Sequence, residues 1–349
     1  MRRNLLKDHV GALLLVLAAL LALSVTLGVS VGSAHIPPGR VWAIIGHRLL
    51  PDWLPQTWPD NEAGIVWRIR LPRVLLGGIV GAGLAIAGAV IQSLVRNSLA
   101  DPYLLGISSG ACAGAVFVIL FASRLFEITR SGMCEVSLLA FVGAGLAFTL
   151  VFLIAGRGGL NPVRMVLAGL AVSYIFMALT NFMVYLTQHN GAESAMFWMM
   201  GGLGGARWNR LGIPLVVTLA CLALFTARAR SLNALLLGDE NAVALGVDVP
   251  RFRLFLFVAT SLLTGVIVAV SGSIGFVGLI VPHAARLLVG ADHRRALPVA
   301  ALLGAVFLVL ADLFARTVLA PRELPLGIVT GFVGAPFFIW LLRRDGGRS

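Results

Sequence analysis

The sequence predicts an all-α, polytopic membrane protein. Its 349 residues are 59% hydrophobic and only 12% charged, and the mean hydropathy is +0.95. Soluble domains carry about 25% charged residues, and several apolar runs here approach or exceed the ~20 residues that cross a bilayer. Because lipid leaves backbone groups no partner outside helices or closed barrels, we expect a helical bundle that forms one membrane domain over residues 1–349.

Ten transmembrane helices are expected along the chain. Their approximate limits are 10–31, 74–95, 103–123, 136–156, 164–187, 211–228, 253–271, 276–290, 296–319 and 324–342. The first run follows a basic start and could pass for a signal peptide, but it exceeds the usual ~7–15 apolar residues, so we interpret it as a retained span. An even number of spans puts both ends of the chain on one side. Placing both ends in the cytoplasm leaves more than half of the Lys and Arg residues inside, which agrees with the positive-inside rule.

Composition and missing motifs exclude several other classes of protein. The formal charge of +12 does not indicate a nucleic-acid partner, because the arginines fall in short loops between spans. Cys112, Cys134 and Cys221 have no metal-like spacing, so we interpret them as small core residues. Lys7 is the only lysine and no phosphate-binding loop surrounds it, so any ATP that drives the protein is hydrolysed by another chain. The G-x-S-x-G and H-E-x-x-H motifs of hydrolases and metalloproteases are absent from the sequence. We expect no catalytic residue, cofactor or metal on this chain.

Glycine and proline mark the ends and contacts of two spans. In the second span, Gly77 and Gly81 form a small-xxx-small pair that lets helices approach closely. A Pro-Arg pair opens this span at Pro72 and opens the seventh span at Pro250. The two spans begin on opposite sides of the expected topology, which is typical of the inverted repeats of transporters.

Few ionisable residues lie inside the spans, where such groups are functional candidates by default. Asp312 lies four residues before Arg316, so the two can pair on one helix face. We favour a satisfied ion pair over a proton relay. His283 follows a proline near an expected helix start, and capping or packing is favoured over a ligand role for haem or iron. The scarcity of buried acids indicates a passive pathway that another component drives.

The segment 231–250 differs from the rest of the chain because acids, bases and small apolar residues mix in it. Gly238 can end one helical turn, and Asp239 and Glu240 can start the next, where anions suit the helix dipole. Short helices are therefore expected here, with a merely solvated loop as the alternative.

Four blocks of sequence resemble the FecCD family and occur in its order: residues 70–111, 232–247, 272–294 and 323–342. This family comprises the permease subunits of ATP-binding-cassette importers for ferric siderophores, haem and cobalamin. The resemblance implies the type II importer architecture with ten spans per subunit, working as a homodimer or as a pair of related permeases. It also implies two cytoplasmic ATP-binding-cassette ATPase subunits and a periplasmic substrate-binding protein, in a bacterial inner membrane.

The resemblance assigns roles to three sets of residues. The segment 231–250 matches the family's coupling segment, which docks in a cleft of the ATPase, and its expected members are Leu235, Leu236, Gly238, Asp239, Glu240, Ala244, Leu245 and Gly246. The outer arginines that hold glutamates of the binding protein match Arg70, Arg73 and Arg316, for which snorkelling to lipid headgroups is the alternative. The inner gate motif N-P-L-A-[DE]-P is matched in "NSLADP" by Asn97, Ser98 and Leu99, with serine in place of the usual proline.

The cargo stays open at this stage. Residues 197–208 resemble the outer segment of haem, siderophore and cobalamin permeases alike. A ferric siderophore or haem is favoured on family frequency, and a cobalamin importer is the alternative. A receptor or sensor on a permease-like scaffold is the rival class, but a sensor need not retain the "LGDENAVALGV" segment as an ATPase dock.

Overall fold

The computed structural model describes residues 9–32, 34–50, 56–122, 133–156, 161–187 and 191–345, and within these ranges the chain is helical with no strand. The helices that run along the bundle are α1 (Val10–Ser30), α4 (Leu71–Val95), α5 (Ile107–Phe117), α7 (Met133–Gly156), α8 (Pro162–Tyr185), α10 (Gly212–Ala227), α13 (Val249–Ser271), α14 (Val277–Val289), α15 (His293–Thr317) and α16 (Leu326–Asp345). The shorter elements are α2 (Pro38–Leu49), α3 (Asp60–Gly64), α9 (Ala192–Met199), α11 (Ala229–Leu236), α12 (Asp239–Ala244), the 3₁₀ turns η3 (Pro102–Leu105) and η5 (Trp208–Arg210), and the π-helical stretches η2 (Ile65–Arg70) and η4 (Val118–Ala122).

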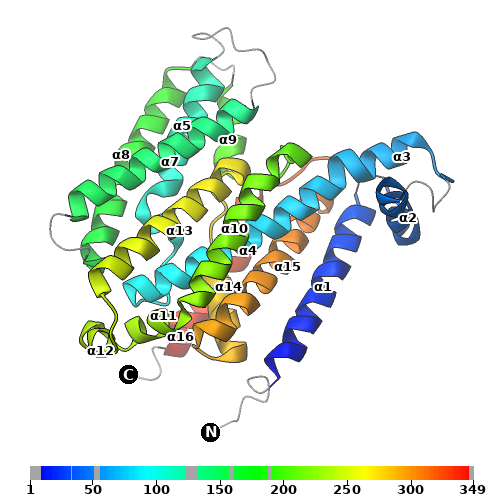
Figure 1. The fold of residues 1–349 in the computed structure, drawn as a ribbon. Coiled ribbons are helices and arrows are strands. Elements are labelled where there is room, and N and C mark those ends of the chain that lie inside the picture. The colour runs from blue at the N-terminus through cyan, green and yellow to red at the C-terminus, as the bar shows by residue number, and fades with distance from the viewer. Residues whose placement is uncertain are drawn as a thin grey trace.

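The ten predicted spans correspond in order to ten helices. In the described ranges, seven helices are long and apolar enough to cross a membrane, and shorter apolar helices stand at the third, eighth and tenth predicted spans. The third helix begins at Ile107 rather than at residue 103, because Pro102–Leu105 forms a 3₁₀ turn that ends at Gly106 with φ +75°. α1 begins and α16 ends at the same end of the bundle (Figure 1), as an even number of spans requires.

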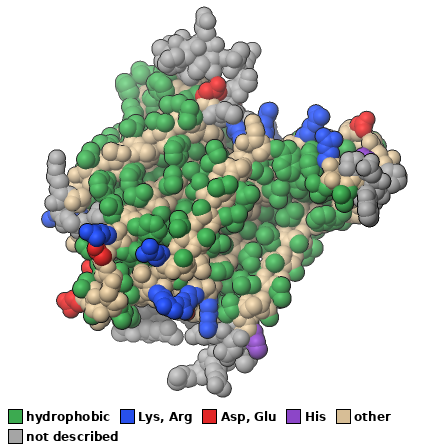
Figure 2. All heavy atoms as spheres, viewed as in Figure 1, with side chains coloured by type: hydrophobic (Ala, Val, Ile, Leu, Met, Phe, Trp, Pro, Cys, Tyr) green, Lys and Arg blue, Asp and Glu red, His purple; other side chains and the backbone are tan. Residues whose placement is uncertain are grey.

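The surface has the distribution of a membrane protein. Figure 2 shows a face that is mainly hydrophobic across its middle, with arginine and acidic side chains gathered towards the two ends. Large apolar side chains are exposed along α7 and α8, among them Leu146, Leu153, Leu167 and Ile175. Such a belt is stable when lipid tails cover it.

α4 passes through the middle of the bundle (Figure 1) and is the most buried of the long helices. Its glycines allow backbone contact with neighbouring helices, since a β-carbon at Gly81 would collide with the carbonyl of Gly304 in α15. A β-carbon at Gly88 would likewise collide with the carbonyl of Gly278 in α14. The close approach predicted from the small-residue spacing is confirmed at Gly81, whereas Gly77 faces the side chain of Leu203.

The short helices α2 and α3 lie at the end of the bundle opposite α11 and α12 (Figure 1). A separate hydrophobic cluster holds them to α1 and α4, and it includes Val29, Ile36, Val41, Ile44, Trp58 and Val66. The Trp208 indole donates a hydrogen bond to the Trp67 carbonyl at 2.8 Å, and the two rings lie 4.9 Å apart. This end is therefore a folded surface rather than a set of loose loops.

The prediction for His283 needs correction. Pro282 lies inside α14 rather than near its start, so His283 does not cap a helix. The proline removes the amide that would bond to the Gly278 carbonyl, and Gln92 Nε2 lies 3.3 Å from that carbonyl and donates to it instead. The His283 ring packs edge-on against Phe337, with 5.9 Å between centroids, which supports the packing interpretation.

The other predictions from prolines and cysteines can be located directly. Pro72 and Pro250 fall in the first turns of α4 and α13, as the Pro-Arg pairs indicate. Cys112 and Cys221 are buried free thiols, which agrees with a core role. The side chain of Cys134 lies outside the described residues.

Candidate functional sites

An ion-pair network lies between α4 and α15, at the end of the bundle that carries α2 and α3. Arg73 Nη2 lies 2.9 Å from Asp312 Oδ1, and Arg316 Nε lies 3.0 Å from Asp312 Oδ2. The Asp312 side chain is only 2% exposed, so two arginines share one buried carboxylate. The predicted pair between Asp312 and Arg316 is confirmed, and Arg73 is a further partner from a distant part of the chain. Glu323, which is half exposed, binds Arg73 Nη1 at 2.9 Å on its other side.

Arg70 and Arg316 also hold the end of α1. The Arg70 guanidinium is buried and donates to the carbonyls of Val29 and Ser30, at 2.9 and 3.1 Å. Arg316 Nη2 donates to the Gly28 carbonyl at 2.9 Å. The three arginines predicted to dock the binding protein are therefore close together, but each is bonded to groups of this chain. Their positions are explained without lipid headgroups, and their docking role stays a prediction.

A cavity of about 1110 Å³ adjoins this network. It lies between α9, the 201–205 segment, the end of α13 and the 322–326 segment. Its charged lining residues are Arg73, Glu193, Arg210, Arg322 and Glu323. A space of this size with charges of both signs suits a large polar molecule or a protruding loop of a partner.

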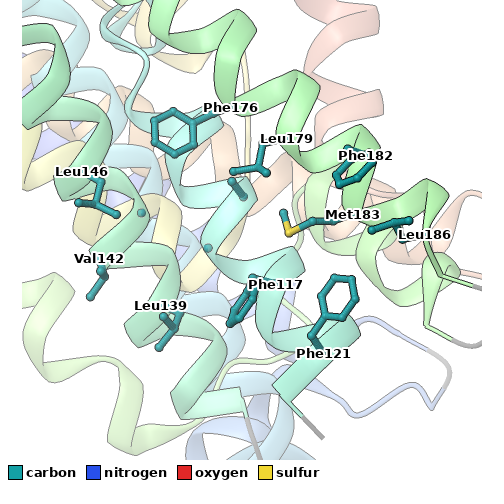
Figure 3. A pocket seen from close by; sticks show the side chains of 13 residues that line it. Phe117, Phe121, Leu139, Val142, Leu146, Phe176, Leu179, Phe182, Met183 and Leu186 are labelled. Atoms are coloured by element: carbon teal, nitrogen blue, oxygen red, sulfur yellow. The ribbon is translucent and has the colours of Figure 1, made fainter. Parts of the chain in front are cut away.

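A second cavity, of about 500 Å³, lies between α5, α7 and α8. Figure 3 shows its apolar wall, in which Phe117, Phe121, Phe176 and Met183 face a common space. The small residues Gly114 and Gly143 form its floor, where α5 and α7 approach each other. The described side chains that line it are all apolar.

The segment predicted to couple to an ATPase forms two short helices at the end opposite the charged cavity (Figure 1). α11 ends at Leu236 and α12 begins at Asp239, with Gly238 between them at φ +103°. The break at Gly238 and the acidic start of α12 are both confirmed, and the solvated-loop alternative is wrong. Leu235 is buried against the bundle and anchors the segment.

The same segment exposes an apolar surface that lies beyond the hydrophobic belt. Leu236, Leu237, Val243 and Leu245 are 40, 63, 60 and 64% exposed. Ala244 and Gly246 are exposed beside them. Sequence reasoning missed Leu237 and Val243, although their place on short amphipathic helices could have identified them. Exposed apolar side chains gathered on one short segment are a feature of interaction surfaces, and the coupling role of this segment stays a prediction.

The two acids of α12 have different surroundings. Asp239 Oδ1 lies 2.7 Å from Arg253 Nη2 and 3.4 Å from Arg96 Nη2. Arg253 belongs to the first turns of α13 and is nearly buried, whereas Arg96 ends α4 and is 42% exposed. Glu240 is exposed. Asp239 of α12 is therefore ion-paired to the end of α4 and to α13, so its charge is not directed only towards solvent.

The predicted gate forms a tight turn directly after α4. Arg96 adopts the left-handed conformation (φ 54°), and the Asn97 amide donates to the Gln92 carbonyl at 3.0 Å. The Asn97 side chain then accepts a hydrogen bond from the Leu99 amide at 2.9 Å. This side-chain hydrogen bond restricts the backbone of the turn, as a proline would by fixing its own φ angle. Ser98 is exposed at the tip.

The last turn of α4 is also bonded to α11 and α15 by polar side chains. Ser93 Oγ and His293 Nε2 lie 2.7 Å apart, and His293 Nδ1 lies 2.6 Å from Asn233 Oδ1 in α11. Asn233 also donates to Asp292 Oδ1 at 2.7 Å. Burial raises the pKa of the Asp292 carboxyl, but the hydrogen bonds from Asn233 and the Arg294 amide, with the neighbouring arginine charges, lower it below its usual value overall. Sequence reasoning found none of these contacts.

Among the residues that the structure describes, no three His, Cys, Asp or Glu side chains group closely enough to hold a metal ion. The arrangement is instead that of a membrane transport subunit, with a charged cavity at one end and exposed apolar side chains of α11 and α12 at the other. The chain belongs to the FecCD transport family, which it matches over residues 20–344. It is a multi-pass membrane permease, as the sequence predicted.

Named relatives include permeases for different cargoes. The chain is 46% identical to the cobalamin import system permease protein BtuC of Halobacterium salinarum, over 82% of this chain and 75% of the relative. It is 43% identical to the hemin transport system permease protein HmuU of Yersinia pestis, over 82% of this chain and 87% of that one. A solved structure of a metal-chelate type ABC transporter in an inward-facing conformation is 30% identical, with a TM-score of 0.82 over 96% of this chain and 99% of its own.

Proposed function

We propose that this chain is the membrane-spanning subunit of an ATP-driven importer that passes a metal chelate, a ferric siderophore or haem, from a periplasmic binding protein to the cytoplasm. The observation that carries the proposal is the exposed apolar face of α11 and α12, fixed next to the predicted gate turn and opposite the charged cavity. The relatives named for hemin and cobalamin transport, and the metal-chelate type neighbour, support the substrate class.

The proposed partners follow from the two ends of the bundle. Two cytoplasmic ATP-binding-cassette ATPase subunits bind the α11–α12 face and hydrolyse the ATP, since this sequence holds no phosphate-binding loop. A second copy of this chain, or a related permease, completes the pathway. This orientation puts both termini in the cytoplasm and the charged cavity on the periplasmic side of a bacterial inner membrane, surrounded by membrane lipid.

The binding protein is proposed to dock at the outer arginines. Of the three, Arg73 combines an exposed partner, Glu323, with a place in the lining of the charged cavity. Arg70 and Arg316 support the docking surface by holding the end of α1. The gate at Asn97, Ser98 and Leu99 closes the pathway at the opposite end.

A transport assay tests the proposal. The chain is purified with its co-encoded neighbours, reconstituted in proteoliposomes with the ATPase and binding protein, and supplied with a ferric siderophore, haem or cobalamin. ATP-dependent uptake of an iron chelate is the expected result. Uptake of cobalamin alone would favour the second candidate, which the 46% identity to a cobalamin permease supports. A chain that retains no ATPase through purification would contradict the importer assignment and favour a sensor.

A further inference from the structure

We propose that Asp239 transmits the movement of the ATPase-docking helix α12 to the gate turn through its ion pair with Arg96. This inference rests on the proposed function, and it gives Asp239 a positioning role inside the permease rather than a contact with the ATPase. Arg96 and Asp239 lie 143 positions apart in the sequence, and neither was paired with the other by sequence reasoning. Their juxtaposition is a property of the fold.

The first step is the connection itself. Asp239 is the first residue of α12, and Arg96 is the residue that ends α4 and begins the gate turn. The Arg96 guanidinium also lies close to Gly238, since a β-carbon there would be 3.6 Å from Arg96 Nη1. A displacement of the α11–α12 turn therefore either carries the Arg96 side chain with it or breaks the contact.

The second step is the difference between the two partners of Asp239. The bond to Arg253 is short, at 2.7 Å, and that arginine side chain is only 9% exposed. The bond to Arg96 is longer, at 3.4 Å, between groups that are 42% and 41% exposed. The pair with Arg253 keeps α12 on α13, because breaking it would leave the nearly buried Arg253 charge without this partner. The exposed pair makes or breaks at little cost, so it is the contact suited to change during a transport cycle.

The third step is the backbone at Arg96. A left-handed residue other than glycine stands at the point where α4 stops, and the next amide closes the helix end on Gln92. Asn97 then fixes the turn through its side chain. A left-handed residue closed by such a hydrogen bond is a common way for a helix to end, and here it places the Arg96 side chain at the first residue of the turn. A pull on the Arg96 side chain therefore acts directly on the start of the gate.

The experiment uses the complete complex of permease, ATPase and binding protein in proteoliposomes, with uptake and ATP hydrolysis measured on the same sample. Arg96→Gln and Asp239→Asn are each expected to lower the uptake per ATP hydrolysed by about two- to fivefold, the upper figure corresponding to the largest usual contribution of an exposed ion pair. Arg96→Lys is expected to restore most of the ratio because it keeps the charge. The matched control is Arg251→Gln, which removes an 89% exposed arginine paired with Asp248 on the same side of the protein.

A double variant separates coupling from simple damage. If Arg96 and Asp239 act through each other, Arg96→Gln with Asp239→Asn lowers the ratio no further than Asp239→Asn alone, which also removes the partner of Arg253. Co-purification of the ATPase is expected to be unchanged in the Arg96 variants. An unchanged ratio in Arg96→Gln, additive losses in the double variant, or loss of ATPase binding in Arg96→Gln would each overturn the inference. If Arg96→Gln does not fold, Arg96→Asn takes its place, because asparagine removes the charge and tolerates the left-handed backbone. Failure of the unaltered chain to bind an ATPase would instead overturn the proposed function.

Discussion

Replacing Asp312 by asparagine tests the buried ion-pair network between α4 and α15. Asp312 accepts hydrogen bonds from Arg73 Nε and Nη2, at 3.1 and 2.9 Å, and pairs with Arg316 Nε at 3.0 Å. Asparagine has the same size but no charge, so both guanidinium groups stay buried, at 11% and 7% exposure, without this counter-charge. Removing one partner of a buried pair costs about 3–5 kcal/mol. Because Glu323 still neutralises Arg73, we expect a loss near the lower limit, about 3 kcal/mol.

The assay is unfolding of the purified chain in detergent, followed with a thiol-reactive dye. Cys112 and Cys221 are buried, so they react as the bundle opens. The control is Glu323→Gln, which removes the half-exposed partner of Arg73 and is expected to cost no more than about 1 kcal/mol. If Asp312→Asn unfolds like the unaltered chain, or if Glu323→Gln is equally damaging, the network does not stabilise the fold in the way described.

Three further outcomes are expected. Glu323→Gln should tighten docking of the binding protein and make docking less sensitive to added carboxylate ions, because the Arg73 guanidinium no longer pairs with a carboxylate of its own chain; weaker docking in a binding measurement would contradict this. Ser98→Pro should fold and transport normally, because Ser98 is exposed and no hydrogen bond from its amide occurs among the described residues; loss of folding, seen by size-exclusion chromatography, would show that the turn needs a different backbone. Leu237→Glu with Leu245→Glu should abolish co-purification of the ATPase while leaving thermal stability nearly unchanged, since both side chains are more than 60% exposed; retained ATPase would place the docking face elsewhere.

Local signals in the sequence were sufficient for much of the fold. The order of the helices follows from apolar run length, because each membrane helix satisfies its own backbone. The break between α11 and α12 follows from Gly238 and the acids after it, and the pair between Asp312 and Arg316 follows from their spacing on one helix turn. These features depend on residues within a few positions of one another.

Contacts between distant segments could not be predicted in the same way. Arg73 and Asp312 are 239 positions apart, and only the packing of α4 on α15 brings them together. Pro282 indicated a helix start, but a side chain from α4 satisfies the carbonyl that this proline leaves free. An isolated sequence gives no sign of such compensation, so the error at His283 is of the kind expected where tertiary contacts override a local rule.

The two ends of α4 are built for different mechanical roles. At the start of α4, Arg73 is almost fully enclosed and shares a buried carboxylate with α15, so moving it requires separating charges at a cost of several kcal/mol. At the end of α4, Arg96 and Asp239 are both about two-fifths exposed, and such a pair contributes only ~0–1 kcal/mol. Equal force applied along this helix therefore rearranges the Arg96–Asp239 contact first. The proposed coupling needs that asymmetry, because a gate turn driven from α12 must move while the surface proposed for the binding protein keeps its shape.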